Sequence, residues 1–198
     1  MKNKKFNIKI KKFIPNKAGL GGGSMNAASI LKYLIKKGII DINKKDVIEV
    51  TNSIGSDVIL GLNNTNSILT SNNNIKRYNK CKKFYTLIVK PNFGCSTKQI
   101  YSNVKIFSKP KLKKPSSKMF ELNYLKKMNN SLEQIVLSKY SKLRKIKSFL
   151  EGLPGILFVR MTGSGSAFVA YFNSKKRCQN AKKQFVKKYK NYWCISSK

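Results

Sequence analysis

A run of glycines between a predicted strand and a predicted helix is the feature that most constrains the fold of this chain. Residues 15–25 read Pro15, Asn16, Lys17, Ala18, Gly19, Leu20, Gly21, Gly22, Gly23, Ser24 and Met25. Consecutive glycines let backbone N–H groups converge on an anion without an obstructing Cβ, and the start of a helix adds unpaired N–H groups and its dipole. The pattern therefore predicts a phosphate-binding loop. A flexible tight turn is the structural alternative.

The spacing of this loop excludes two common nucleotide-binding motifs. A Walker loop ends in Gly-Lys-Ser/Thr, and no lysine follows this glycine run. The dinucleotide pattern Gly-x-Gly-x-x-Gly needs a glycine at position 24, which is Ser24.

Apolar periodicity predicts the elements around the loop. Alternating apolar residues over 6–10 indicate a half-buried strand that ends before Pro15. A helix is predicted to begin at Ser24 as its N-cap and to end at Gly38. A second helix, capped by Asn43, is predicted to end in the turn 55–57.

The rest of the chain continues as a mixture of strands and helices. We expect a hairpin or loop over 63–79, a strand over 84–89, a linker over 108–118, helical segments over 122–136, 143–150 and 181–189, and strands over 156–159, 167–172 and 192–195. No internal repeat is visible, so two α+β units, residues 1–80 and residues 81–198, are the simplest interpretation.

The charge balance limits the chemistry that this chain can perform. It has 42 Lys and Arg against 7 Asp and Glu, a formal net charge of +35, and no His. Without His, the chain cannot build a Ser-His-Asp triad or a His-ligated metal site. Only 4 of the 42 cations are Arg, the side chain that readers of base sequence favour. We therefore predict a lysine-rich solvated surface and no specific nucleic-acid partner; a basic nucleic-acid-binding protein is an alternative.

Cysteine spacing and hydropathy suggest a compartment. The four cysteines show no Cys-x-x-Cys spacing, so we expect reduced thiols in a cytosol-like compartment. No stretch approaches the roughly 18 apolar residues of a membrane span, and the basic start is not followed by a continuous apolar run. We expect a cytoplasmic protein without a membrane partner. The sequence does not indicate its oligomeric state.

Two further turns contain residues that chemistry could use. Asp57, in Gly55-Ser56-Asp57-Val58, could accept a proton from an attacking hydroxyl near a phosphate site. An aspartate in a turn also commonly accepts a local backbone hydrogen bond. The turn Thr-Gly-Ser-Gly-Ser at 162–166 lies between two predicted strands and fits a hairpin as well as a ligand-contacting loop.

Taken in order, five stretches resemble the GHMP kinase superfamily. They are its phosphate loop at 15–28, Gly-Ser-Asp-Val at 55–58, Pro…Ser-Thr-x-x-x-Tyr at 91–101, Asn-Ser-Leu-Glu at 130–133 and Arg-Met-Thr-Gly-Ser-Gly-Ser at 160–166. The triple glycine is similar to the branch that phosphorylates the 2-hydroxyl of 4-diphosphocytidyl-2-C-methyl-D-erythritol in non-mevalonate isoprenoid biosynthesis.

This resemblance implies an α+β GHMP kinase fold, with an incomplete N-terminal α/β domain (1–80) and a ferredoxin-like C-terminal domain (81–198). It implies ATP with Mg²⁺ as cofactors, ATP phosphates on the loop 15–25, and a small-molecule substrate that carries a cytidine diphosphate group. Asp57 would orient or deprotonate the acceptor hydroxyl. The sequence alone assigns no metal ligand; by resemblance Ser24 is the candidate, with Asp57 as a candidate neighbour.

The chain departs from this family at its N-terminal end. Members begin with a strand that carries a catalytic lysine in Lys-x-Asn-Leu, followed by an Asp-Gly-Tyr-His segment that binds cytidine. Neither is identified here, and we match the strand at 5–10 to the one just before the phosphate loop. We expect the N-terminal portion to be absent, so a truncated, inactive relative that still binds nucleotide is an alternative.

Overall fold

The structure, a computed structural model, describes residues 5–70, 74–106 and 114–197. It divides into two compact units. The first unit consists of the described residues of Met1–Ile14, Gly21–Asn79 and Lys111–Pro115, and the second consists of those of Pro15–Leu20, Lys80–Pro110 and Ser116–Lys198. Each unit mixes helices and strands, which confirms the α+β prediction. The predicted domain boundary between residues 80 and 81 stays a prediction.

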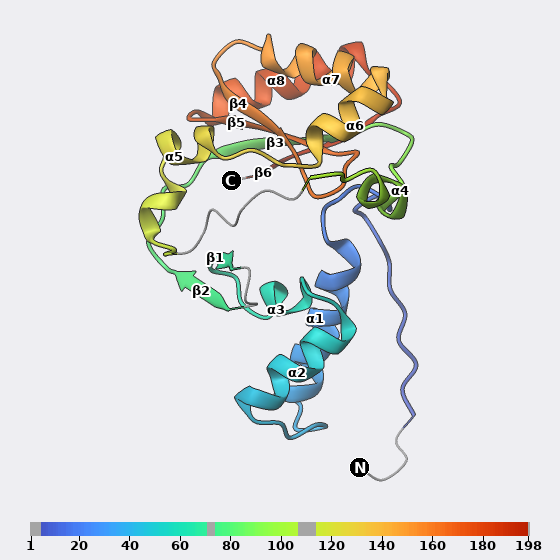
Figure 1. Cartoon of the computed structure of the whole chain (residues 1–198), viewed down its shortest axis with the longest axis vertical. Helices are drawn as coiled ribbons and strands as arrows, with labels where there is room; N and C mark the ends of the chain where they lie inside the picture. The colour runs from blue at the N-terminus through green and yellow to red at the C-terminus, as the bar shows by residue number, and fades with distance from the viewer. Residues whose placement is uncertain (1–4, 71–73, 107–113, 198) are drawn as a thin grey trace. The chain divides into compact units, whose positions relative to one another are not determined.

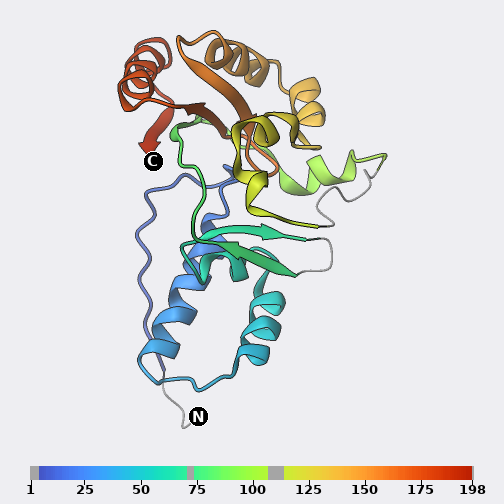
Figure 2. The ribbon, with the colours of Figure 1, turned by 90° about the vertical axis from the view of Figure 1, so that its left-hand side faces the viewer.

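The first unit is three helices followed by a hairpin. Its elements are α1 (Gly22–Lys36), α2 (Lys44–Ile54), α3 (Val58–Gly61), β1 (Asn66–Leu69) and β2 (Ile75–Tyr78). Figure 2 shows α1 and α2 side by side and joined at one end. The antiparallel pair β1–β2 confirms the predicted hairpin, whose residues 71–73 lie outside the described residues.

The start of α1 differs from the prediction. Gly21, with φ 64° and ψ 19°, is the N-cap, and the helix begins at Gly22 rather than after Ser24. Glycine adopts this left-handed conformation without steric cost, so the N-cap lies three residues before the serine that local preference favours. The predicted stop at Gly38 is confirmed, because this residue has φ 62° and its N–H bonds to the Ile35 carbonyl at 3.0 Å.

The predicted cap of α2 is confirmed. The Asn43 side chain accepts hydrogen bonds from the N–H groups of Lys45 (2.8 Å) and Asp46 (3.0 Å). Such a cap satisfies two of the four N–H groups that a helix start leaves unpaired.

The strand predicted over 6–10 is wrong. Residues 5–14 form no regular secondary structure, and none of the described strands pairs with them; Figure 1 draws the segment as an extended run. The side chains of Phe6 and Ile8 are 52% and 53% exposed. Alternating apolar residues create one apolar face, but a strand also needs the hydrogen bonds of a neighbour.

The second unit is built on a four-stranded antiparallel sheet. Its elements are β3 (Tyr85–Lys90), α4 (Thr97–Ser102), a 3₁₀ turn η1 (Ser117–Phe120), α5 (Leu122–Lys127), α6 (Glu133–Lys139), α7 (Ser141–Glu151), β4 (Ile156–Met161), β5 (Phe168–Phe172), α8 (Lys175–Lys188) and β6 (Trp193–Ser197). The strand order is β4-β5-β3-β6 with antiparallel neighbours. This βαββαβ order confirms the predicted ferredoxin-like arrangement.

The core of this unit lies between the sheet and its helices. Figure 1 shows α7 and α8 over one face of the sheet. Leu143 and Leu150 of α7 are fully buried against this face, together with Phe168 and Phe172 of β5 and Phe185 of α8. Each such side chain stabilises the fold by about 1.5–3 kcal/mol relative to leaving it in water. The helix predicted over 143–150 is therefore confirmed with its apolar face.

Other predicted bounds shift. The segment 122–136 forms two helices, α5 and α6, and α8 begins at Lys175, because the Ser174 hydroxyl caps it by accepting the Arg177 N–H at 3.5 Å. Of the linker predicted over 108–118, residues 108–113 lie outside the described residues, and η1 begins at Ser117. No helix of the described ranges is long and apolar enough to cross a bilayer.

Candidate active site

The first half of the glycine loop, Pro15–Leu20, packs in the second unit on the turn 162–166. The buried Ala18 offers its carbonyl oxygen to the Ala167 N–H at 3.1 Å and to the Thr162 hydroxyl at 3.2 Å. Gly19 has φ 69°, and a Cβ there would overlap the Thr162 carbonyl oxygen and lie 3.0 Å from the Gly165 nitrogen. The loop therefore requires glycine at position 19 for its conformation and for its close contact with the turn.

The turn 162–166 joins β4 to β5 and is itself held tightly. The Thr162 N–H donates to the Ala167 carbonyl at 2.9 Å, and the Gly165 N–H donates to the Thr162 carbonyl at 2.8 Å. Gly163 and Gly165 have positive φ values of 46° and 81°. The turn joins antiparallel neighbours, which confirms the predicted hairpin, and it also contacts the glycine-loop segment 15–20.

A third segment, 91–97, joins these two in the second unit. The Ser166 hydroxyl donates to the Phe93 carbonyl at 2.8 Å, and the hydroxyls of Thr97 and Ser164 lie 2.9 Å apart. A Cβ on Gly94 would lie 2.5 Å from the Cβ of Lys17. Three of the five sequence stretches thus meet at this turn, and a fourth, 130–133, reaches it through Asn130, although all are far apart in the chain.

Lys90 is a residue of this region to which sequence reasoning gave no role. Its side chain is buried, and its ammonium group donates to the carbonyls of Pro91 (2.8 Å) and Phe93 (3.0 Å). Burial lowers the pKa of Lys90, and the nearby Cys95 thiol partly opposes this. The sequence signal that could have identified this residue is a lysine at the end of an apolar strand, just before a proline. Lys90 fixes the segment that the Ser166 hydroxyl contacts.

The second half of the loop, Gly21–Met25, belongs to the first unit and opens α1. The Met25 N–H bonds to the Gly21 carbonyl at 2.9 Å, so the earlier N–H groups of this 15-residue helix have no helical partner. A Cβ built on Gly22 or Gly23 would meet no atom within 4 Å. An open helix start with unpaired N–H groups can accommodate an anion.

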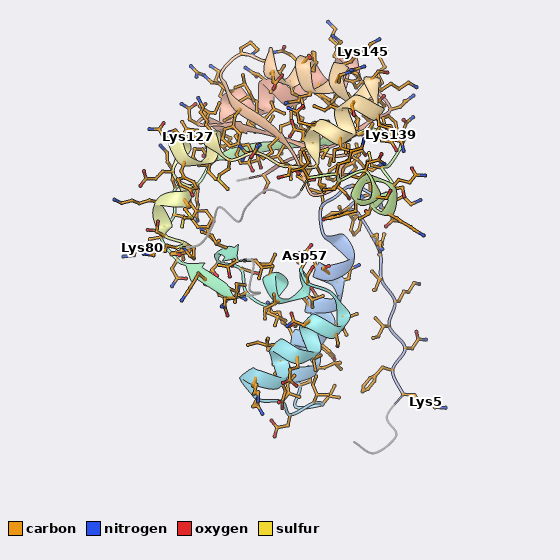
Figure 3. All side chains as sticks on the ribbon, viewed as in Figure 1. Lys5, Asp57, Lys80, Lys127, Lys139 and Lys145 are labelled. Carbon is orange, nitrogen blue, oxygen red and sulfur yellow. The ribbon has the colours of Figure 1, made fainter. Side chains whose placement is uncertain are left out.

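Asp57 lies in the first unit, in the turn between α2 and α3. Its side chain is exposed and does not cap α3. Gly61 of α3 packs closely on α1, because a Cβ there would lie 2.7 Å from the Cβ of Ala28 and 2.9 Å from the sulfur of Met25. Figure 3 shows Asp57 toward the end of the first unit at which α1 begins. Asp57 thus occupies the N-cap position of α3 without a capping hydrogen bond from its side chain.

The structure thus brings the predicted site residues together in two groups. Gly21, Gly22, Gly23, Ser24, Met25 and Asp57 belong to the first unit, and Pro15, Asn16, Lys17, Ala18, Gly19 and Leu20 belong to the second. In the described ranges, no three His, Cys, Asp or Glu side chains gather into a cluster. All four cysteines carry free thiols, and Cys95 and Cys178 are buried.

Comparisons with known proteins agree with this geometry. Residues 1–68 match the GHMP kinases N terminal domain, and residues 112–191 match the GHMP kinases C terminal domain. The chain is 56% identical over 198 residues to 4-diphosphocytidyl-2-C-methyl-D-erythritol kinase of Pelagibacter ubique (strain HTCC1062), and covers 70% of that protein. It is 35% identical over 191 residues to the protein of the same name from Clostridium botulinum (strain Loch Maree / Type A3), with 92% of this chain and 68% of the relative covered.

Solved structures share the fold. The crystal structure of 4-(cytidine 5'-diphospho)-2C-methyl-D-erythritol kinase superposes with a TM-score of 0.75 at 22% identity, covering 94% of this chain and 68% of that one. Homoserine kinase from Cytophaga hutchinsonii superposes with a TM-score of 0.68 at 14% identity, covering 94% of this chain and 67% of that one. The expected fold is therefore confirmed.

Proposed function

The chain belongs to the GHMP kinase family, and from this premise we propose that it transfers a phosphoryl group from ATP to the 2-hydroxyl of 4-diphosphocytidyl-2-C-methyl-D-erythritol. The 56% identity to the Pelagibacter kinase over the whole chain is the observation that carries the proposal. The reaction places this chain in isoprenoid biosynthesis as a small-molecule kinase.

The loop 15–25 is the proposed binding site for the ATP phosphates. In its second half, the unpaired N–H groups at the start of α1 and the open surface at Gly22 and Gly23 support this role. In its first half, the bonds from Ala167 and Thr162 to the Ala18 carbonyl fix the backbone before nucleotide arrives. A fixed loop lowers the ordering cost of binding, and phosphoryl transfer depends chiefly on such positioning.

Asp57 is the proposed catalytic carboxylate, which would orient the acceptor hydroxyl and take its proton. The chain has only three aspartates, and this one lies in a turn with an exposed side chain that does not cap the helix it precedes. A carboxylate with free oxygens can accept the proton of an attacking hydroxyl.

Mg²⁺ fits the oxygen donors of the first unit. This ion is commonly held by one or two carboxylates together with substrate phosphates and water, so a cluster of acidic side chains is not required. The exposed carboxylate of Asp57 and the Ser24 hydroxyl in the first turn of α1 are the donors we propose. When bound, the ion would neutralise phosphate charge as the phosphoryl group is transferred.

The decisive experiment compares Asp57→Asn with the unaltered chain and with Asp41→Asn, which removes the same charge from another exposed loop. Phosphorylation of the diphosphocytidyl substrate by ATP is followed as ADP release. We expect Asp57→Asn to lower kcat by about 10²-fold or more while nucleotide affinity changes little, because the amide cannot accept the proton. Asp41→Asn should keep the unaltered rate. Equal rates for Asp57→Asn and the unaltered chain would contradict the role of Asp57.

A further inference from the structure

Met161, the last residue of β4, ends an edge strand, and side chains of the segment 130–133 take the place of a neighbouring strand there. Because the Thr162 N–H points toward β5, both backbone groups of Met161 point the opposite way. The Met161 N–H donates to Glu133 Oε2 at 2.9 Å, and its carbonyl accepts from Asn130 Nδ2 at 3.0 Å. Unpaired, these two buried groups would cost free energy.

Asn130 also reaches the turn itself. Its Nδ2 donates to the Gly163 carbonyl at 2.7 Å, while its Oδ1 accepts the Leu132 N–H at 3.0 Å. Since the oxygen is committed to Leu132, the amide nitrogen faces both carbonyls. This one side chain therefore joins the end of β4 to the second residue of the turn.

Glu133 is held in place by a charged partner. It is a buried residue, and its Oε1 lies 2.6 Å from Lys147 Nζ, which also pairs with Glu151 at 3.5 Å. Burial lowers the pKa of Lys147, but the hydrogen bond and charge of Glu133, with those of Glu151, outweigh it and raise the pKa above its usual value. Lys147 therefore stays charged through neutral pH. A buried ion pair adds little stability by itself, but it fixes where the carboxylate lies.

Arg160 anchors the other end of the same segment. Its guanidinium donates to the carbonyls of Leu125 and Met128 at the end of α5, and it lies 5.0 Å from the ring centre of Phe158. The backbone leading to Asn130 is thus attached to β4 on both sides. The four residues 130–133 cannot shift without breaking bonds to β4 or to the turn.

We propose that Asn130 and Glu133 are positioning residues for nucleotide binding, which act by holding the turn 162–166 in the conformation that supports Ala18 and Gly19. The inference rests on the proposed function, because its effects on the KM for ATP and on kcat require the kinase activity. Neither residue needs to touch ATP: the path runs from Asn130 and Glu133 to Met161 and the turn, and from Thr162 and Ala167 to the Ala18 carbonyl.

The experiment uses the full chain and four variants. Asn130→Asp keeps the size of the side chain but places an oxygen opposite the two carbonyls. Glu133→Gln keeps an oxygen that can accept the Met161 N–H, and Glu133→Leu does not. Glu151→Gln removes the other charged partner of Lys147 but leaves the hydrogen bonds to β4 intact, so it serves as the matched control. ADP affinity, the KM for ATP, kcat, and hydrogen exchange of the Gly165 and Ala167 amides are measured well below the melting temperature.

We expect Asn130→Asp and Glu133→Leu to weaken ADP binding and to raise the KM for ATP by about tenfold or more, since small misplacements of binding groups have large effects. Exchange of the Ala167 amide, which bonds to the loop, should accelerate in both. Glu133→Gln should restore affinity close to that of the unaltered chain, and Glu151→Gln should leave it unchanged. If the two residues had a merely structural role, the variants would have a lower melting temperature but unchanged ADP affinity and unchanged exchange of the Ala167 amide.

One result would overturn the proposal: folded Asn130→Asp protein with unchanged ADP affinity and unchanged Ala167 exchange. This variant decides the matter even where Glu133→Leu fails to fold. The proposed function fails separately, if the unaltered chain binds ADP but does not phosphorylate the diphosphocytidyl substrate. The exchange measurement needs no turnover, so it tests the positioning role of Asn130 and Glu133 in either case.

Discussion

The glycines of the loop have different physical roles, and Gly19 has the strictest one. Its positive φ of 69° is costly for any residue with a Cβ, and backbone atoms of the turn 162–166 fill the space where that atom would lie. Gly23, by contrast, is a helical residue of α1 with open space around it. The two positions therefore provide a matched pair.

Gly19→Ala should lower the free energy of unfolding by about 2 kcal/mol or more, the sum of a left-handed conformation and an overlap with backbone. Gly23→Ala should raise it by up to about 1 kcal/mol, because alanine has the higher helix propensity. Urea denaturation of both variants measures the difference. Equal changes in the two variants would mean that Gly19 does not pack as described.

For single residues, the sequence could predict features that depend only on residues nearby in the chain. The cap at Asn43 and the stop at Gly38 depend on residues within a few positions and were predicted correctly. The support of Gly19 was not predictable, because the hydrogen bond from Thr162 to Ala18 spans 144 residues. The cap placed at Ser24 was wrong because Gly21 offered a left-handed start that residue preferences do not weigh.

Among the elements, the short helix α3 is held by a side chain of another element. A helix of four residues is too short to be stable alone. Arg77 of β2 donates from one guanidinium nitrogen to the Ile59 carbonyl at 2.8 Å and from the other to the Ser67 hydroxyl at 3.3 Å. The hairpin thus holds the helix that follows Asp57.

Arg77→Met should therefore lower the free energy of unfolding by about 2 kcal/mol, since it leaves a half-buried carbonyl without its charged donor. It should also lower kcat, because α3 follows the proposed catalytic carboxylate. Lys76→Met, at the exposed neighbouring position of β2, is the control and should change either quantity little. Denaturant titration and the ADP-release assay measure both. A kcat that does not change in destabilised Arg77→Met would separate α3 from catalysis.

The elements also mark where periodicity is insufficient. The apolar faces of α7 and β5 were predicted correctly because each is buried against a partner within the second unit. Residues 6–10 also have a regular alternation of apolar residues, but none of the described strands pairs with them. A sequence pattern records which face is apolar and leaves the partner undetermined.

For the molecule as a whole, charge is the dominant property. Against a net charge of +35, the described residues contain two ion pairs, both made by Lys147. Lys80, Lys127 and Lys145, labelled in Figure 3, are exposed lysines of the second unit. Like charges at this density repel one another and oppose compaction.

Added salt should therefore stabilise the protein. We expect the melting temperature to rise as NaCl increases from about 0.05 M to about 0.5 M, because the Debye length shortens from above 10 Å to a few Å. Replacing Lys80, Lys127 and Lys145 by Gln should reduce the slope of this dependence. Differential scanning calorimetry of both proteins is the measurement. A melting temperature that falls with NaCl would show that the charge does not limit stability.

The long separation in sequence between Ala18 and the turn that bonds to it has a consequence for synthesis. Thr162, which bonds to the Ala18 carbonyl, is synthesised 144 residues after Ala18. At about 5–20 residues per second, this is a delay of roughly 7–30 s. During that time the Ala18 carbonyl lacks the hydrogen bonds from Thr162 and Ala167. The Ala18 carbonyl thus gains the Thr162 and Ala167 donors only after the turn that carries them has been synthesised.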